Sequence, residues 1–148
     1  MLTTPQRAQY LPLAMRVFGV IWSLIGTTFV LTPTLARWHP YNTAYEHMFA
    51  SLFVTWGILL LRGAKHPEQA LSIIDFSILE GFLHGGAMVY DAIWGGHPMY
   101  QHFLSDIPLH LLSGTIFLLL RPRPLPRLTA LETGLIGINV LFVFVWLR

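Results

Sequence analysis

The stretch QALSIIDFSILEGFLHGGAMVYDAIW, residues Gln69–Trp94, decides the fold of this chain. It is long enough for one membrane crossing, because a bilayer core about 30 Å thick needs roughly 20 mostly apolar residues in a helix. It also carries ionisable side chains, namely Asp75, Glu80, His84 and Asp91. Such groups are costly in lipid and usually face the interior of a helix bundle. The stretch therefore predicts a membrane-spanning helix with one polar, inward-facing side.

Four further segments have the same apolar character. They are Leu13–Thr32, Thr43–Leu61, Phe103–Leu120 and Leu128–Leu147. The gaps between the segments contain residues that end helices or form turns. These are Pro33, Pro40, Pro67, the run Gly95-Gly96-His97-Pro98 and the proline-rich run Arg121–Arg127. We therefore expect an all-α, polytopic membrane helix bundle in one domain, residues 1–148. It would have five transmembrane helices, arranged as a four-helix core plus a C-terminal helix.

Composition supports a membrane protein and excludes several other classes. Hydrophobic residues make up 54% of the chain and charged residues 11%, whereas a soluble domain carries about 25% charged residues. The formal net charge of +2 is small, and the basic residues alternate with apolar segments, so we expect no nucleic-acid partner. The chain has no cysteine, which excludes disulfides and thiolate chemistry.

The positive charges predict an orientation. If all five segments cross, most basic residues share one side, and only Arg37 and Arg148 lie on the other. The first group consists of Arg7, Arg16, Arg62, Lys65, Arg121, Arg123 and Arg127. The positive-inside rule then places the N-terminus in the cytoplasm and the C-terminus in the periplasm of a bacterial inner membrane.

Aromatic residues point the same way, since rings of this kind favour the membrane interface. Those assigned to the outer interface are Trp38, Tyr41, Tyr45, Tyr90, Trp94, Tyr100 and Trp146. Asp75 falls in the cytoplasmic half of its segment, where Arg62 or Lys65 could pair with it.

The other ionisable residues predict a polar pocket. Glu80 and His84 are one helical turn apart, and the same spacing relates Asp106 to His110 in the fourth segment. Short connections make the second, third and fourth segments neighbours. We expect one outward-facing acid/histidine pocket between them. Its ligand-binding residues would be Glu46, His84, Asp91, Asp106 and His110.

Several kinds of chemistry fit such a pocket. A metal site would use His84, His110, Glu46 and Asp106, because carboxylates and imidazoles on facing helices hold metal ions in helix bundles. Haem held by His84 and His110 is a further alternative. The sequence does not identify a cofactor.

An enzymatic alternative is proton transfer on a lipid-like substrate, such as an isomerisation or a cyclisation. A neutral acid in an apolar pocket can donate a proton and a nearby imidazole can accept one. In this hypothesis the catalytic residues are Glu80 as acid, His84 as base and Asp106 as the orienting group.

A third interpretation needs no chemistry. Glu46, His84 and Asp106 would form interhelical hydrogen bonds that fix the packing. The sequence thus predicts a membrane protein that binds a small ligand or metal, or serves as an accessory subunit of a membrane complex. Its expected partners are the lipid bilayer, subunits of such a complex and a hydrophobic small molecule.

The chain also resembles a known group of proteins. The motifs are Tyr45-Glu46-His47-Met48, His84-Gly85 followed by Met88, and Ser105-Asp106-Ile107-Pro108. They are similar to those of an uncharacterised family of small bacterial multi-pass inner-membrane proteins. The likeness covers roughly residues 10–120, so the fifth segment lies outside it. The resemblance implies the architecture and points to Glu46, His84 and Asp106, but it implies no activity.

Overall fold

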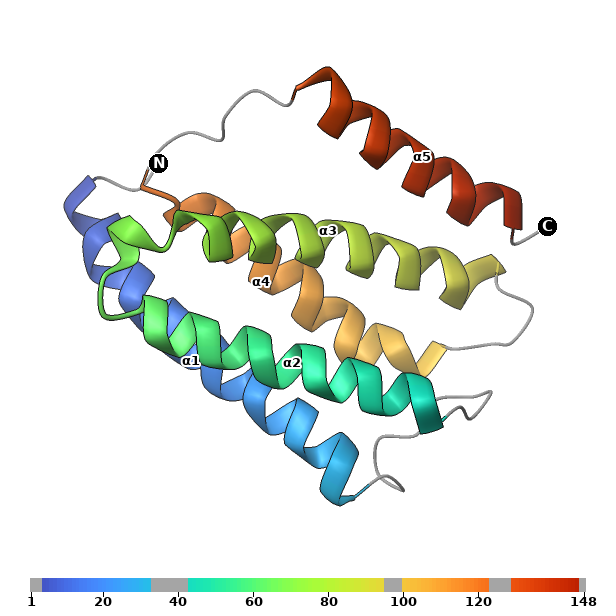
Figure 1. Cartoon of the computed structure of the whole chain (residues 1–148), viewed down its shortest axis with the longest axis horizontal. Helices are drawn as coiled ribbons and strands as arrows, with labels where there is room; N and C mark the ends of the chain where they lie inside the picture. Colours follow the sequence, from blue (N-terminus) through green and yellow to red (C-terminus); the bar gives the residue numbers. More distant parts are fainter. Residues whose placement is uncertain (1–3, 33–42, 95–99, 123–128, 147–148) are drawn as a thin grey trace.

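The computed structural model describes residues 4–32, 43–94, 100–122 and 129–146, and Figure 1 shows the arrangement of its helices. The expectation of an all-α fold is confirmed for these residues. The helices are α1 (Thr4–Leu31), α2 (Thr43–Gly63), α3 (Leu71–Trp94), α4 (Asp106–Leu120) and α5 (Ala130–Trp146). Two short 3-10 helices, Pro67–Gln69 and Tyr100–Leu104, precede α3 and α4.

Three of these helices are long and apolar enough to cross a membrane: Thr4–Leu31, Ala44–Gly63 and Leu71–Trp94. Helix α4 is apolar but has 15 residues, which span about 22 Å at 1.5 Å per residue. It is shorter than the expected segment because Tyr100–Leu104 forms a separate 3-10 turn. Helix α1 starts earlier than expected, since it continues through Pro12.

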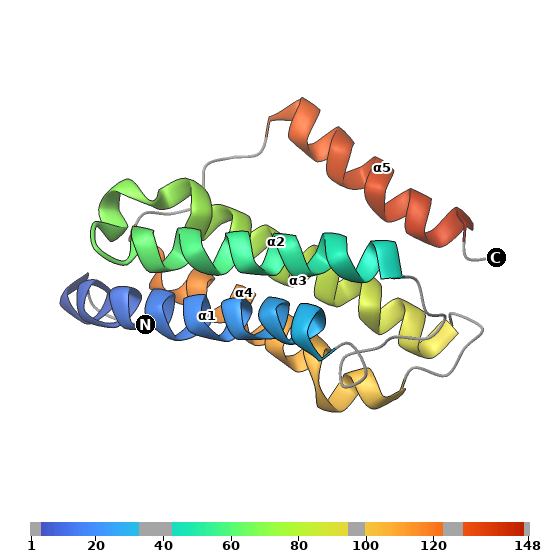
Figure 2. The same cartoon turned by 60° about the horizontal axis from the view of Figure 1, so that its bottom comes forward.

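Helices α1 and α2 pack along each other, as do α3 and α4, and α1 also contacts α4. Figures 1 and 2 show these four helices as one body, with α5 standing away from it in both views. The side chains of α5 that the structure describes are largely exposed. The polar residues of interest therefore lie within the bundle of α1 to α4.

Small residues bring α1 and α2 close together. A Cβ atom added at Gly57 would meet Ser23 Oγ and the backbone oxygen of Gly19. Glycine and serine are the usual residues at such close contacts between apolar helices, because they let the backbones approach. This contact places the aromatic side chains of α1 and α2 in one layer.

The core of the bundle is aromatic. The Trp22 and Trp56 rings stack with centroids 4.4 Å apart, and Phe53 stacks on Trp22 at 5.2 Å. The buried indole of Trp56 donates a 2.8 Å hydrogen bond to Ser77 Oγ on α3, which ties the two helix pairs together. The indole N–H of Trp22 has no such bond within the described part of the chain.

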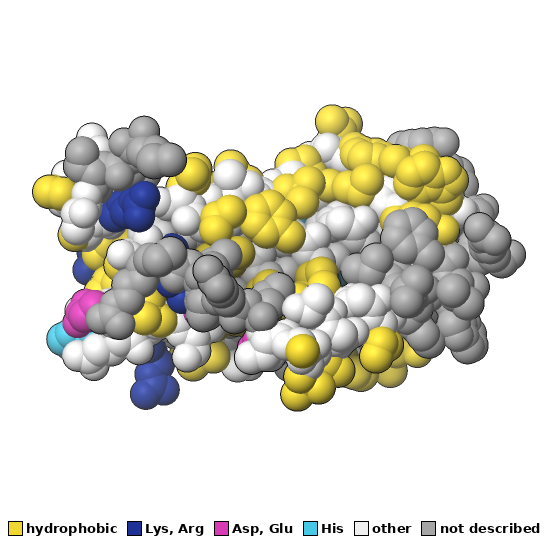
Figure 3. Space-filling view, turned by 90° about the horizontal axis from the view of Figure 1, so that it is seen from above, with side chains coloured by type: hydrophobic (Ala, Val, Ile, Leu, Met, Phe, Trp, Pro, Cys, Tyr) yellow, Lys and Arg dark blue, Asp and Glu magenta, His cyan; other side chains and the backbone are white. Residues whose placement is uncertain are grey.

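The outer surface of the four-helix body is largely apolar. Leucine and valine side chains such as Leu13, Leu24, Val30 and Leu119 are more than half exposed. In Figure 3 the charged side chains gather at one end, and hydrophobic side chains cover much of the remaining described surface. In a soluble monomer such surface would be unfavourable, whereas in a bilayer it faces lipid.

An ion pair joins α3 and α4 at the charged end. Arg121 Nε donates to Asp75 Oδ1 at 2.6 Å, and Arg121 Nη2 donates to Oδ2 at 2.8 Å. These hydrogen bonds raise the pKa of Arg121. Arg7 of α1 donates to the backbone oxygen of Arg121. The partner of Asp75 is thus Arg121, and the expectation of Arg62 or Lys65 was wrong because it considered only residues near Asp75 in the sequence.

We predict that Asp75 and Arg121 are energetically coupled. Asp75→Asn or Arg121→Gln should each lower the free energy of unfolding in detergent by about 1–3 kcal/mol, because each leaves a charged partner without its hydrogen bonds. The double variant should lose less than the sum of the two. Arg62→Gln, which changes an exposed side chain, is the control and should shift stability by less than about 0.5 kcal/mol. Strict additivity would contradict the coupling.

Candidate functional site

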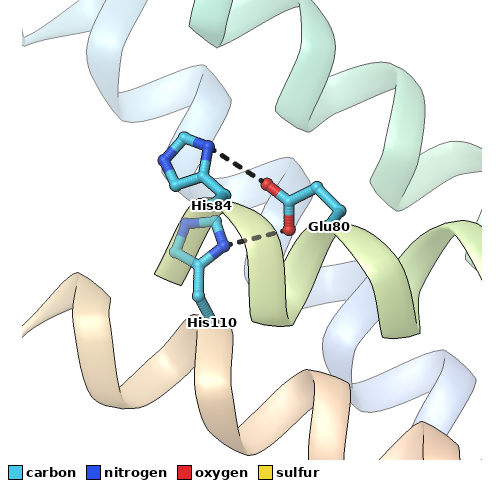
Figure 4. Close-up of side chains that lie close together, drawn as sticks. All are labelled: Glu80, His84 and His110. Atoms are coloured by element: carbon cyan, nitrogen blue, oxygen red, sulfur yellow. Dashed lines mark hydrogen bonds and ion pairs between the residues drawn. The ribbon is translucent and has the colours of Figure 1, made fainter. Parts of the chain in front are cut away.

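The site lies where α3 faces α4, and it contains one carboxylate beside two stacked imidazoles (Figure 4). Glu80 and His84 are one turn apart on α3, so both reach the same side of that helix. His110 comes from α4. Glu80 Oε2 lies 3.0 Å from His110 Nδ1, and Glu80 Oε1 lies 3.4 Å from His84 Nδ1. The carboxylate therefore contacts both helices.

Glycine makes this contact possible. A Cβ atom at Gly81 would lie 2.6 Å from the backbone oxygen of His110 and 2.8 Å from Gly114 Cα. The backbones of α3 and α4 thus touch directly beside Glu80. Any larger side chain at Gly81 would push α4 away and carry His110 with it, since the colliding atoms are backbone atoms that cannot rotate aside.

The histidines lie in an aromatic environment. His110 is 1% exposed, and its ring centroid is 4.7 Å from that of Trp22. The His84 ring stacks on the His110 ring with centroids 4.4 Å apart and planes 13° apart. The Phe49 ring of α2 meets His84 edge-on at 5.8 Å. Aromatic rings thus exclude water from His110 and leave His84 as the more accessible histidine.

The geometry restricts the hydrogen positions. An ionised carboxylate only accepts hydrogen bonds, so with Glu80 ionised His110 Nδ1 carries the hydrogen and donates it. In both imidazoles the ring nitrogen that lies near Glu80 is Nδ1. Two stacked, nearly parallel rings do not present nitrogens from opposite directions, as two axial ligands of a haem iron must.

The three side chains could hold a metal ion. One ligand atom from each of Glu80, His84 and His110 lies within 4.8 Å of the other two. Ligand atoms about 2.0–2.1 Å from a tetrahedral zinc lie about 3.3 Å from one another, so a zinc ion would require these atoms to move closer together. Two histidines and one carboxylate are also a common ligand set for other divalent metals of the first transition row.

The structure brings together only part of the pocket expected from the sequence. His84 and His110 meet, and Glu80 joins them in place of Glu46 and Asp106. Asp106 instead binds His102, whose Nδ1 lies 2.7 Å and 2.8 Å from the two carboxylate oxygens. The role of Asp106 as an orienting group for His84 stays a prediction.

The remaining expected ligand residues, Glu46 and Asp91, are not part of the Glu80 cluster. Glu46 of α2 is 5% exposed, and its Oε1 has no hydrogen-bond partner within the described residues. Asp91 Oδ1 is likewise buried without such a partner. Their predicted ligand-binding roles are untested by these contacts. His102 lies in the 3-10 helix before α4, and its i, i+4 spacing to Asp106 is the sequence signal for this pair.

The fold and the site define the class of this protein: it is an all-α helix bundle whose apolar helices surround a buried acid–histidine cluster. The chain belongs to a family of unknown function, DUF6632, whose model matches residues 4–129. This match confirms the resemblance to an uncharacterised family, and it ends just before α5. No curated protein and no solved structure shows significant similarity to the chain.

The glycine contact generates a testable prediction with a neighbouring control. Gly81→Ala should lower the thermal unfolding temperature of the purified protein, with a loss of about 1–3 kcal/mol, because the added methyl group collides with backbone. Gly86→Ala adds the same methyl group where no atom lies within 4 Å. It should be neutral or stabilise by up to about 1 kcal/mol through helix propensity. Equal effects of the two substitutions would contradict the tight α3–α4 contact.

Proposed function

We propose that this chain is a polytopic protein of a bacterial inner membrane that binds one divalent transition-metal ion at Glu80, His84 and His110. The observation that carries the proposal is the cluster itself: three ligating side chains, from two helices, gathered in an apolar interior. Ionisable groups in such an interior are costly, so a group of them is a candidate functional site.

The charge distribution supports the proposed topology. Arg7, Arg62, Lys65 and Arg121 lie near the starts or ends of α1 to α4 that meet at one end of the bundle. By the positive-inside rule this end faces the cytoplasm. In the proposed arrangement α4, extended by the preceding 3-10 turn, is the fourth span and α5 is the fifth. The C-terminus then lies in the periplasm, and the acid/histidine cluster lies within the membrane.

Burial of the ligand atoms supports a metal ion as the occupant. The side chains of Glu80 and His110 are 10% and 1% exposed, and that of His84 is 23% exposed. Glu80 Oε1 is buried and has no hydrogen-bond partner within the described residues. A divalent ion would satisfy this oxygen and would also neutralise the carboxylate.

Proton transfer on a hydrophobic substrate is a second candidate. The close approach of Glu80 Oε1 to His84 Nδ1, at 3.4 Å, favours it. A buried carboxylic acid can donate a proton, and the partly exposed His84 can exchange one with a bound molecule. If the chain were an accessory subunit of a membrane complex, the cluster would serve only to form hydrogen bonds between helices.

Metal analysis of protein purified without a histidine tag tests the proposal. After incubation with zinc, iron(II) or manganese(II) and removal of free ions, we expect about one bound ion per chain for one of these metals, as for other sites with two histidines and a carboxylate. Glu80→Gln, His84→Gln and His110→Gln should each weaken binding by at least about 10-fold.

The matched control is His66→Gln, which removes an imidazole that is 71% exposed in its side chain and lies outside the cluster. It should leave metal content unchanged. A wild-type protein that elutes as a folded species and retains none of the three metals would overturn the proposal. Equal losses in His66→Gln and His110→Gln would do the same, because they would indicate surface binding.

A further inference from the structure

A shallow groove runs along one face of α2. It has a volume of about 570 Å³ and is lined by Tyr45, Met48, Phe49 and Leu52, and it falls within the size range of small-molecule sites. The four residues follow the i, i+3, i+4, i+7 spacing of a single helix face. No charged side chain is among them.

Phe49 connects this groove to the cluster. It is only partly exposed, and its ring meets the His84 ring edge-on at 5.8 Å. Helix α2 packs mainly on α1, and α3 packs mainly on α4, so the seam between α2 and α3 is lightly packed. His84 is also the most exposed member of the cluster. A molecule lying over Phe49 would therefore have its end close to His84.

The surroundings of the groove indicate that a ligand would enter it from the lipid phase. Met48 is 64% exposed and Leu52 is 39% exposed, and both belong to a helix apolar enough to span a membrane. In that setting Met48 and Leu52 face lipid, and Tyr45 lies at the outer interface. An apolar chain dissolved in the bilayer can enter it without first leaving the hydrocarbon phase.

The chemistry of His84 identifies the other end of the ligand. A neutral His84 has one ring nitrogen with a lone pair, and this nitrogen is a hydrogen-bond acceptor. Such an acceptor pairs with a hydroxyl group. A hydroxyl oxygen is also a possible ligand for an open coordination position of a metal held by two histidines and one carboxylate.

We propose that the groove along α2 admits a lipid-soluble alcohol or phenol from the bilayer and delivers its hydroxyl group to His84. This inference rests on the proposed function in that it assigns the ligand class of the same cluster. Tyr45, Met48, Phe49 and Leu52 contact the chain, and the Glu80–His84 pair recognises the head group.

Photolabelling of the full chain in nanodiscs tests this inference. The probes are a long-chain alcohol carrying a diazirine in its chain and the matching hydrocarbon without the hydroxyl group. We expect the alcohol to label Met48, Phe49 and Leu52, and excess unlabelled alcohol to compete for these positions. The alcohol should exceed the hydrocarbon in labelling by about 5- to 10-fold, the effect of one hydrogen bond.

Matched variants separate the groove from general lipid contact. Leu52→Trp fills the groove and should abolish the alcohol-specific labelling. Ile58→Trp adds the same side chain to a different, exposed face of α2 and should leave it unchanged. His84→Gln should keep labelling by the hydrocarbon but lose the preference for the alcohol. Even labelling of all exposed faces, or an unchanged preference in Leu52→Trp, would overturn the inference.

The same samples distinguish this inference from the metal proposal. Metal content is measured for each variant, and labelling is repeated after removal of metal by a chelator. Leu52→Trp should retain the metal and lose the alcohol. A wild-type protein that binds no metal but shows selective, competed labelling would overturn the proposed function and support the groove. A protein that binds metal but shows no selective labelling would overturn the groove alone.

Discussion

The direct contact between the backbones of α3 and α4 at Gly81 and Gly114 is the constraint on which the rest of the site depends. It sets the separation of the two helices at the level of Glu80 and His110, and a 3.0 Å contact across them follows. The ring stacking of His84 on His110 requires the same separation. Packing of small residues thus determines where the polar atoms of α3 and α4 meet.

The bundle combines an apolar exterior with polar contacts in its interior. Water cannot compensate a polar group inside a bilayer, so each polar side chain must find a partner within the protein. Arg121 and Asp75 are partners near the charged end of the bundle, and Trp56 and Ser77 are partners in the core. Glu46 and Asp91 retain buried oxygens without a hydrogen-bond partner in the described residues. Buried groups of this kind are uncommon and draw attention to the end of the bundle where α2 begins and α3 ends.

The amino-acid sequence allowed the helical character and the polar face of α3 to be predicted, because both depend on local periodicity. The i, i+4 spacing of Glu80 and His84 was sufficient to place them together. The choice of partners from other helices could not be predicted in this way. Asp106 was expected beside His84, but it pairs with His102 one turn before it. Asp75 pairs with Arg121, 46 residues away. Such pairings depend on helix rotation and on glycine contacts, and neither follows from the spacing of residues in one segment.

The position of the stacked Trp22 and Trp56 rings beside His110 has a practical consequence. Indole emission responds to polarity, to nearby protonated imidazole and to paramagnetic ions. The ring centroids of Trp22 and Trp56 lie 4.7 Å and 6.3 Å from that of His110. The chain thus carries a built-in optical probe of its own interior. Changes in the polarity around the buried cluster can be followed by fluorescence spectroscopy on unlabelled protein.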